Sequence, residues 1–301
     1  MSENILVELS DALAAAADRG GGSTVLVNAR RRMPASGIVY ATDQILTANH
    51  VVERDEDISV ALPDGSELAA TVTGRDPGSD LALLKLERDA ASPAEPTKTP
   101  ARVGQIALAL GRPSKEGIEA SLGTVSAIGG PFRTHRGGML ERYLRTDSIP
   151  YPGFSGGPLV AADGTILGLN TSGLTRGAAI TIPADIAWKV AEDIAKHGHI
   201  RRGYLGIRSQ TVEIPTAMQN VLRQKQVNAT GLLVVGVEDD SPAAKGGLMV
   251  GDILVGVDGS PVKHHDDLFA HLTGDVIGKS TPIAVLRGGK QETVNVVIGE
   301  R

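Results

Sequence analysis

The most constraining feature of this 301-residue chain is a series of short β-type runs between residues 23 and 182. Gly, Pro, Asn and Asp separate one run from the next. Many short strands at this spacing predict an antiparallel barrel or sandwich rather than a βαβ array. The runs are STVLVNA (23–29), ASGIVYA (35–41), QILTANHVV (44–52), DISVALP (57–63), ELAATVTG (67–74), LALLKL (81–86), QIALALG (105–111), GIEASLGTVSAIGG (117–130), GPLVAADGTILGLN (157–170) and AAITIP (178–183).

The glycine content also favours many tight turns. The chain has 37 glycines, whereas an average content of about 7% would give roughly 21. They lack the G-X-Y period of collagen, so turns explain the excess. The Pro/Ala-rich stretch at 88–101 lies between two buried-looking strands, and we expect a surface loop within one domain or between two lobes of it.

Apolar residues at helical spacing precede and follow this β region, and we expect one helix on each side of it. An N-terminal helix is expected to end at the glycines 20–22, with Ile5, Leu6, Leu9 and Leu13 on one face. A second helix is predicted over 183–200, with Pro183 near its start and Gly198 as its stop. Its apolar stripe consists of Ile186, Val190, Ile194 and the intervening Ala residues.

A second unit with its own strands follows, and we expect two helices in it, at about 214–226 and 265–273. The sequence therefore predicts an N-terminal helical segment at 1–22, a first domain at 23–200 and a second domain at 201–301.

Composition excludes several classes of protein. The chain has no cysteine, which excludes disulfides, thiol catalysis and thiolate metal sites. Its net charge of 30 − 35 = −5 gives no general attraction for nucleic acid or anionic membrane. No stretch approaches the roughly 18 apolar residues of a membrane span. The acidic N-terminus is no secretory signal, so the sequence as given indicates a cytoplasmic protein, or a periplasmic or extracytoplasmic one if it has been trimmed.

The segment GFSGGP at 153–158 is the strongest local signal for chemistry. A serine hydroxyl is a weak nucleophile that needs a base, and donors for the oxyanion that forms. The glycines permit a tight turn that would expose the Ser155 hydroxyl and aim the N–H groups of Gly153, Phe154 and Ser155 into one small cavity. Taken alone, the segment is equally compatible with a Gly-rich turn that holds an incidental serine.

Two further segments supply the partners that such a serine needs. His50, in TANHVV, is the only one of the seven histidines at an otherwise apolar strand end. Asp80, in DPGSDLALL (76–84), stands at the start of an apolar strand, where it could orient an imidazole. The ordinary alternatives are a structural histidine and a turn cap, but the order His50, Asp80, Ser155 is that of chymotrypsin-like proteases.

These motifs resemble those of the HtrA (high-temperature-requirement) serine proteases. The resemblance rests on TANHVV, DPGSDLALLKL, FSGGPLV and GTILGLNT, and it includes GRPSKEGIEASLGTVSAIG (111–129) and TDS (146–148). It covers roughly nine-tenths of the chain, from about residue 35 to 301. It implies a mainly β fold: a chymotrypsin-like double β-barrel with the site between the barrels, followed by a PDZ domain (α+β).

By position, the resemblance implies that Ser155 is the nucleophile, His50 the general base and acid, and Asp80 the buried residue that orients the imidazole. The Gly153 and Ser155 N–H groups, with Phe154 between them, would form the oxyanion hole. The resemblance places the substrate pocket at Ile149, Pro150, Asn170 and Thr171. Candidate sensing and activation loops are 130–142, 148–154 and 171–178.

Two features depart from the family pattern. The family usually has Asn where this chain has Phe154, and the large ring must find room at the mouth of the site. Pro150 and Pro152 limit how the preceding loop can reshape, so the loop is either modified and gated by substrate or partly disabled. Trypsin-like enzymes that bind basic side chains have an acid where this chain has Ile149, which favours Val, Ala or Leu at the cleaved position.

The second unit resembles a PDZ domain in RRGYLGI (201–207), SPAAKGGL and GDILVGVDGSPV. Next to Tyr204, three successive N–H groups would bind the C-terminal carboxylate of a peptide that pairs with the following strand: those of Leu205, Gly206 and Ile207. The helix at 265–273 would present Leu268 and Leu272 to the groove, unless both side chains are simply core.

The resemblance implies an ATP-independent serine endopeptidase that degrades misfolded or unfolded polypeptides, with C-terminal peptides at the PDZ groove and assembly as a homotrimer. It implies no cofactor, and we expect no metal, no nucleic acid and no membrane span. The rival hypothesis is a chaperone-like peptide-binding module whose protease domain is weak or silent because of Phe154.

Overall fold

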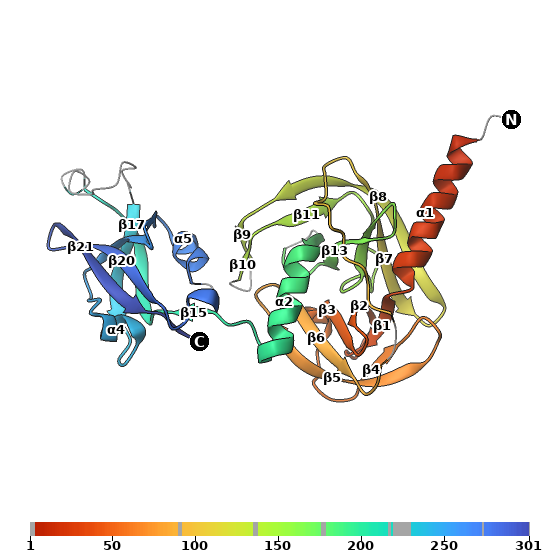
Figure 1. Cartoon of the computed structure of the whole chain (residues 1–301), viewed down its shortest axis with the longest axis horizontal. Coiled ribbons are helices and arrows are strands. Elements are labelled where there is room, and N and C mark those ends of the chain that lie inside the picture. The colour runs from red at the N-terminus through yellow and green to blue at the C-terminus, as the bar shows by residue number, and fades with distance from the viewer. Residues whose placement is uncertain are drawn as a thin grey trace. The chain divides into compact units, whose positions relative to one another are not determined.

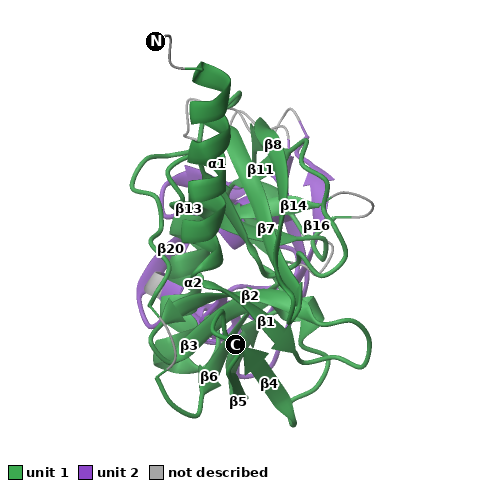
Figure 2. Cartoon of the chain, turned by 90° about the vertical axis from the view of Figure 1, so that its right-hand side faces the viewer, with its two compact units in different colours: residues 1–200 green, residues 201–301 purple. Residues whose placement is uncertain are grey.

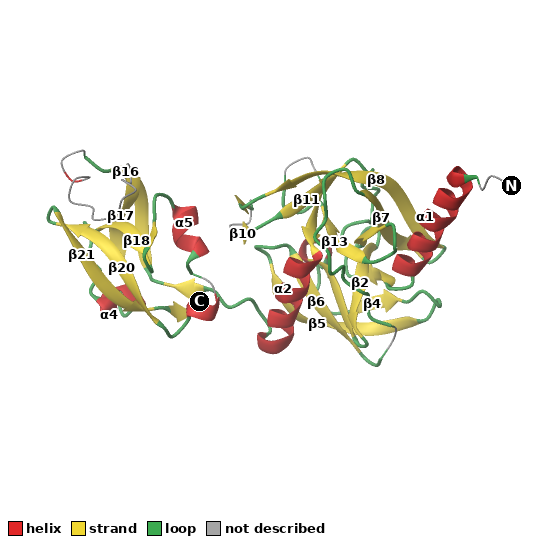
Figure 3. Cartoon of the chain, turned by 45° about the horizontal axis from the view of Figure 1, so that its top comes forward, coloured by secondary structure: helices red, strands yellow, loops and turns green. Residues whose placement is uncertain are grey.

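Figure 1 shows the computed structural model, which describes residues 4–89, 92–134, 138–175, 179–215, 218, 230–272 and 274–300. The chain separates into two compact units, Met1–Ile200 and Arg201–Arg301 (Figure 2). Strands predominate in both units, as the colouring by secondary structure shows (Figure 3).

The first half of unit 1 is a closed barrel with the strand order β1-β2-β3-β6-β5-β4. All neighbouring strands are antiparallel, and closure leaves no unpaired strand edge in the barrel. Strands such as β6, with five of its six residues buried, are continuously apolar because both of their faces are covered. The strands are β1 (Thr24–Asn28), β2 (Ala35–Ala41), β3 (Gln44–Ala48), β4 (Ile58–Ala61), β5 (Glu67–Asp76) and β6 (Leu81–Leu86).

A second closed barrel follows, with the strand order β11-β14-β13-β12-β7-β8. A short hairpin of β9 (Phe132–Arg133) and β10 (Met139–Leu140) extends from it. The barrel strands are β7 (Ile106–Ser114), β8 (Gly117–Gly129), β11 (Tyr143–Thr146), β12 (Pro158–Ala161), β13 (Ile166–Thr171) and β14 (Ile180–Pro183).

The predicted connection at 88–101 joins β6 of the first barrel to β7 of the second, so it lies between two lobes of one unit. Its described part is held by both barrels. The Ala94 N–H donates to the Val39 carbonyl, and the Thr97 N–H donates to the Ile166 carbonyl. The connection therefore follows the seam between the barrels.

Both helices predicted in unit 1 are present. α1 (Ile5–Gly21) begins after Asn4, whose side chain accepts the Leu6 N–H, and it packs on β7 and β12 near its C-terminus. Its N-terminal turns are open, with Ile5 74% exposed. None of the helices in the described part of the chain has the length and apolar character that crossing a bilayer requires.

α2 (Ala184–His197) ends at Gly198, which has a φ of +78° and is the predicted stop. Its fully buried residues are Ala184, Ala187, Ala191 and Ile194. The predicted stripe is confirmed: Ile194 and the alanines are buried, and Ile186 and Val190 are partly buried against the same core.

Unit 2 is built on a sheet with the order β16-β17-β18-β20-β21, beside which β19 pairs with β18 and β15 pairs with β22. The two barrels and this unit confirm the predicted fold class. Helix α5 (His265–Ala270) is shorter than predicted, and the helix predicted at 214–226 lies almost entirely outside the described residues. The elements are β15 (Gly203–Tyr204), β16 (Ile207–Glu213), β17 (Thr230–Val237), α4 (Pro242–Gly246), β18 (Ile253–Val257), β19 (Ser260–Pro261), β20 (Ser280–Arg287), β21 (Lys290–Val297) and β22 (Gly299–Glu300).

Asp252 is a buried acid in unit 2 that is 1% exposed. Its two carboxylate oxygens accept from Nε and Nη2 of Arg287 at 2.7 Å each, and Oδ2 also accepts the Met249 N–H at 2.9 Å. Burial raises the pKa of Asp252, but the hydrogen bonds from Arg287 and Met249 and the charge of Arg287 hold this pKa below its ordinary value. The resulting stabilisation is fully present above about pH 4 and is lost as the pH falls through the lower folded-state pKa.

Asp252→Asn is expected to lower the free energy of unfolding of unit 2 at neutral pH by about 1–3 kcal/mol, because the Arg287 guanidinium loses its carboxylate partner. Urea unfolding followed by circular dichroism measures the change, and Trp188, the only tryptophan, reports separately on unit 1. The difference from wild type should shrink below about pH 4. Glu292→Gln is the control, since that exposed carboxylate touches the same Arg287 at 3.4 Å; an equal loss in both variants contradicts the prediction.

Candidate active site

His50 lies in the short helix η1 (Asn49–Val51), directly after β3 of the first barrel. Its Nδ1 is 2.7 Å from Oδ2 of Asp80, and its backbone N–H donates to Oδ1 of the same carboxylate at 2.9 Å. An ionised carboxylate only accepts hydrogen bonds, so Nδ1 carries the proton. The neutral imidazole therefore keeps a lone pair on Nε2, which can take a proton from a hydroxyl.

Asp80 is fully buried at the end of the turn between β5 and β6. The Asp76 carboxylate builds this turn by accepting the Gly78 and Ser79 N–H groups at 3.2 and 3.0 Å. Asp80 has a φ of +58°, in the left-handed region that aspartate tolerates better than most residues. The Thr171 hydroxyl, from β13 of the second barrel, also donates to Oδ2, so both barrels fix the carboxylate.

Ser155 lies in the loop that precedes β12; residues 153–157 are called the nucleophile loop below. Gly153 and Gly156 have φ values of +87° and +88°, which favour glycine. A Cβ on Gly156 would also come within 2.1 Å of the Ser36 carbonyl oxygen. The backbone conformation of the loop therefore requires glycine at positions 153 and 156, as the sequence pattern indicates.

Residues 171–173, at the end of β13, bring the three candidate side chains together. Thr171 contacts the Asp80 carboxylate, and the hydroxyl of Ser172 is 3.2 Å from the hydroxyl of Ser155. A Cβ on Gly173 would come 2.3 Å from Oδ2 of Asp80 and 2.5 Å from Nδ1 of His50. Within the described part of the chain, the Ser155 hydroxyl makes no hydrogen bond to His50.

The nucleophile loop leaves two N–H groups available. Those of Gly153 and Ser155 have no hydrogen-bond acceptor among the residues that the structure describes. The Phe154 N–H, in contrast, donates to the Tyr151 carbonyl at 3.1 Å. Two donors without a protein acceptor, on either side of Phe154, can stabilise the negatively charged oxygen of a carbonyl that Ser155 attacks.

The Phe154 ring does not lie at the mouth of the site, where its size led us to expect it. It is 2% exposed and packs in the core of the second barrel, edge-on to the Tyr151 ring at 5.4 Å between centroids. Gly111 makes the space, because a Cβ there would come 2.5 Å from the ring. The ring anchors the nucleophile loop in the barrel and leaves the Ser155 hydroxyl uncovered.

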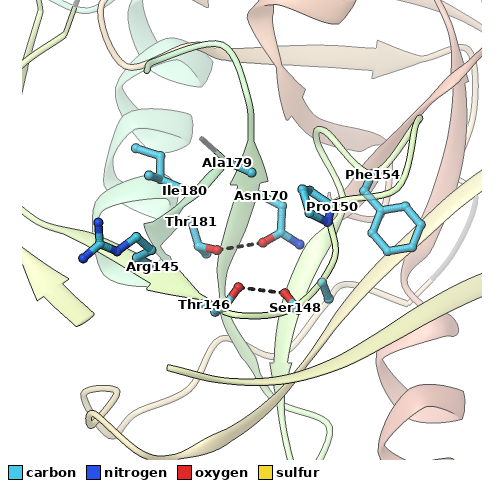
Figure 4. A pocket seen from close by; sticks show the side chains of 10 residues that line it. Arg145, Thr146, Ser148, Pro150, Phe154, Asn170, Ala179, Ile180 and Thr181 are labelled. Atoms are coloured by element: carbon cyan, nitrogen blue, oxygen red, sulfur yellow. Dashed lines mark hydrogen bonds between the residues drawn. The ribbon is translucent and has the colours of Figure 1, made fainter. Parts of the chain in front are cut away.

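A cavity of about 260 Å³ opens beside the nucleophile loop (Figure 4). Two of the predicted pocket residues, Pro150 and Asn170, line it, whereas Ile149 is exposed and Thr171 points to Asp80. Arg145 is the one charged residue in the lining, which consists of Ala109, Arg145, Thr146, Ser148, Pro150, Phe154, Asn170, Ala179, Ile180 and Thr181.

Asn170 is fixed at both ends of its side chain. The Thr181 hydroxyl donates to Oδ1 at 2.7 Å, as Figure 4 shows, and Nδ2 donates to the Pro158 carbonyl at 2.9 Å. The Asn170 side chain therefore forms a rigid part of the cavity wall. In the described part of the chain no group of three or more His, Asp or Glu side chains is arranged to hold a metal ion.

In the loop before β16 of unit 2, the carbonyl groups of Leu205 and Gly206 accept hydrogen bonds from backbone N–H groups elsewhere in the unit. The Ala243 N–H donates to the Leu205 carbonyl and the Glu238 N–H to the Gly206 carbonyl, both at 2.8 Å. Gly206 has a φ of +81°, which favours glycine. The Tyr204 hydroxyl donates to the Glu238 carboxylate, so this side chain is part of the loop's support.

Leu268 and Leu272 are 3% and 8% exposed in the hydrophobic core of unit 2. Of the two alternatives that the sequence left open, side chains facing the groove or side chains in the core, their burial matches the second. The start of α5 reaches β16 through His265, whose Nε2 lies 3.1 Å from the carbonyl oxygen of Ser209.

Comparison with known proteins identifies both units. The Trypsin-like peptidase domain family matches residues 35–169, and the PDZ domain family matches residues 203–298. The solved structure of the HtrA-type protease AlgW with tripeptide is 30% identical to this chain, with a TM-score of 0.77, over 96% of this chain and 97% of that one. The chain belongs to the HtrA-type serine endoproteases. The resemblance seen in its motifs is therefore confirmed.

Two further relatives support the HtrA-type assignment. The crystal structure of the serine endoprotease from Yersinia pestis is 29% identical, with a TM-score of 0.76, over 96% of this chain and 98% of that one. A probable periplasmic serine endoprotease, DegP-like, from Pseudomonas fulva (strain 12-X) is 37% identical over 272 residues, 88% of this chain and 55% of that protein. The chain spans about half the length of the curated relatives it matches.

Sequence reasoning missed three contacts of the site. It assigned Thr171 to the pocket and did not single out Ser172 or Gly173, although these residues contact Asp80, Ser155 and His50. The only signal was their place directly after the strand GTILGLN, which pairs with the strand that follows the nucleophile. A glycine there indicates a close approach, but the sequence does not say to what.

Proposed function

We propose that this HtrA-type chain is an ATP-independent serine endopeptidase that degrades misfolded or unfolded proteins in protein quality control. One observation carries the proposal. The segment 171–173 lies against the Asp80 carboxylate, the His50 ring and the Ser155 hydroxyl, and His50 is hydrogen-bonded to the buried Asp80 at 2.7 Å. Base, orienting acid and nucleophile thus surround one short piece of chain. Acyl transfer from a peptide bond requires these three groups close together, with Nε2 of His50 within reach of the Ser155 hydroxyl.

In the proposed mechanism the Ser155 hydroxyl attacks the scissile carbonyl carbon while Nε2 of His50 takes its proton. The Gly153 and Ser155 N–H groups stabilise the oxygen that becomes negative. His50 then gives the proton to the leaving amine, and Asp80 stabilises the imidazolium throughout. Water, activated by His50, hydrolyses the acyl-enzyme and restores Ser155.

The side chain before the cleaved bond is proposed to be Val, Ala, Leu or a similar aliphatic residue. The cavity beside the nucleophile loop supports this, because Ala109, Ala179 and Ile180 supply apolar surface and no acid lines it. A basic side chain would find no counter-charge there and would meet Arg145. Peptides with Arg or Lys at the cleaved position are therefore expected to be poor substrates.

The PDZ unit is proposed to bind the C-terminal peptides of substrates or activators. β16 pairs only with β17 among the described strands, so its other edge is open to an added strand. The proposed carboxylate-binding groups are the N–H groups of Leu205, Gly206 and Ile207; the Leu205 and Gly206 carbonyls accept hydrogen bonds from Ala243 and Glu238, which supports this. The AlgW structures contain a tripeptide or a decapeptide, which supports a peptide ligand here.

Assembly and location are part of the proposal. We propose that the chain forms a homotrimer through its protease domains. We also propose that it is located outside the cytoplasm and acts in the stress response. The location is supported by the named relatives, which are probable periplasmic endoproteases. It replaces the cytoplasmic alternative that the sequence as given favoured.

The test of the function is digestion of one protein in two states, reduced and unfolded or native, by the wild-type chain without ATP. We expect cleavage of the unfolded form and survival of the native form. The contact between the Ser155 and Ser172 hydroxyls favours the rival, a binding module with a silent protease domain. Binding of the unfolded protein without any cleavage would establish that rival.

Gly173→Ala is expected to lower kcat about 10²-fold, because a Cβ would push apart the Asp80 carboxylate and the His50 ring and misplace the base. Peptide hydrolysis under saturating substrate measures the loss. Gly22→Ala is the matched control in the same unit, since Gly22 has a φ of −62° and its Cβ would approach no atom closer than 3.4 Å. Equal activity of the two variants would contradict the prediction.

A further inference from the structure

Ser36, in β2 of the first barrel, is fully buried and holds the nucleophile loop of the second barrel. Its hydroxyl donates to the Gly153 carbonyl at 2.7 Å. Its backbone N–H donates to the Ser155 carbonyl at 3.2 Å. One residue thus fixes the carbonyl groups of both residues whose N–H groups are available at the site.

The remaining polar atoms of Ser36 attach it to its surroundings. Its hydroxyl accepts the Arg112 N–H at 2.8 Å, and its carbonyl accepts the Thr47 hydroxyl at 2.7 Å. Arg112 lies on β7, and Thr47 lies on β3, three residues before His50. β2 and β7 are in contact where the two barrels meet (Figure 2). Ser36 therefore joins the nucleophile loop to the strand that positions the base.

These contacts restrict the rotation of the loop's peptide groups. A peptide group is planar, so a hydrogen bond at each end fixes its orientation. The peptide that carries the Gly153 carbonyl is held at its other end by the Phe154 N–H, which donates to Tyr151. The peptide that carries the Ser155 carbonyl is held by the Gly156 N–H, which donates to the Asn170 carbonyl at 2.8 Å.

We propose that Ser36 is a positioning residue for the oxyanion hole: its hydroxyl and N–H fix the 153–154 and 155–156 peptides, which flank the peptide that carries the Ser155 N–H and follow the one that carries the Gly153 N–H, so that both donors point to the reacting carbonyl. The inference rests on the proposed function of Ser155 as nucleophile. Loss of the hydroxyl releases the Gly153 carbonyl and leaves the buried Arg112 N–H without an acceptor, so the backbone at Gly153 is free to shift. A shift at Gly153 misplaces its own N–H, a donor that is needed only in the transition state.

The test is Ser36→Ala, assayed with a peptide substrate and with a peptide boronate that forms a tetrahedral adduct on Ser155. We expect kcat and the boronate affinity to fall together by about 10- to 100-fold, since one oxyanion donor becomes misplaced. We expect KM, and binding of the uncleaved peptide to the Ser155→Ala background, to stay within about threefold, because ground-state contacts are unchanged. A merely structural role would lower the amount of active enzyme without changing the boronate affinity.

Ser23→Ala is the matched control, because Ser23 is also buried in unit 1 and its hydroxyl donates to a backbone carbonyl, that of Gly20. It should match wild type in kcat and boronate affinity. If Ser36→Ala does not fold, Ser36→Cys takes its place, and protection of its thiol, the only one in the chain, from a thiol reagent demonstrates folding. A folded Ser36 variant with wild-type kcat and boronate affinity overturns the proposal, whereas an inactive wild-type chain overturns the proposed function instead.

Discussion

Ser155→Ala is expected to lower kcat for peptide hydrolysis by about 10⁶-fold, which is the size of loss seen when a serine protease loses its nucleophile. The substitution removes only the hydroxyl, whose partner in the structure is the hydroxyl of Ser172. No other contact that supports the nucleophile loop uses this oxygen: the Ser155 carbonyl still accepts the Ser36 N–H. The fold and the oxyanion donors should therefore survive.

The measurement combines digestion of an unfolded protein with binding of the same protein to the variant. Binding should match wild type while cleavage disappears, and inhibition of the wild type by a serine-directed phosphonate should label Ser155 alone. Ser66→Ala, which removes a serine hydroxyl at a surface turn where it contacts Asp64, is the control and should keep full activity. Cleavage by Ser155→Ala at the wild-type rate would assign the activity to another residue or another protein.

Asp80→Asn is expected to lower kcat about 10⁴-fold while the fold is retained. The Asp80 carboxylate accepts three hydrogen bonds: from Nδ1 and the backbone N–H of His50 and from the hydroxyl of Thr171. An asparagine side chain has one oxygen and one N–H₂ group, so it cannot satisfy all three donors. An N–H₂ group opposite Nδ1 favours the tautomer that carries the proton on Nε2, which cannot take the Ser155 proton.

Single-turnover hydrolysis of an activated ester and of a peptide measures this loss, and KM should change little because Asp80 is fully buried. Asp163→Asn serves as the control, since Asp163 is likewise a turn acid that accepts backbone and hydroxyl hydrogen bonds from Thr165 but lies at the surface. A kcat within about tenfold of wild type would show that Asp80 does not set the tautomer of His50.

The sequence could predict the parts of the site whose geometry is encoded locally. His50, Asp80 and Ser155 each stand in a turn or strand end whose neighbours dictate the backbone, such as Asp76, whose carboxylate builds the turn before Asp80. The glycines around Ser155 indicate a left-handed path for the same reason. These signals extend over only a few residues, so a single sequence is enough to find them.

The contacts between distant segments could not be predicted. Thr171 on Asp80 and Ser36 on Gly153 depend on the register of strands in two different barrels. Phe154 illustrates the same limit: its size suggested a ring at the mouth of the site, but Gly111, 43 positions earlier in the chain, provides room for it in the core. Only the packed structure shows which small residue provides the space that a given large side chain occupies.

The division of the site between two barrels has a consequence for protein synthesis. A chain emerging from the ribosome completes the strands around His50 and Asp80 well before β12 and β13 exist. Until the later barrel closes, Thr171 cannot hold the Asp80 carboxylate, and Ser36 has no Gly153 to bind. On the proposed mechanism, a copy whose second barrel has not folded therefore lacks a complete site, and cleavage requires both barrels to be folded.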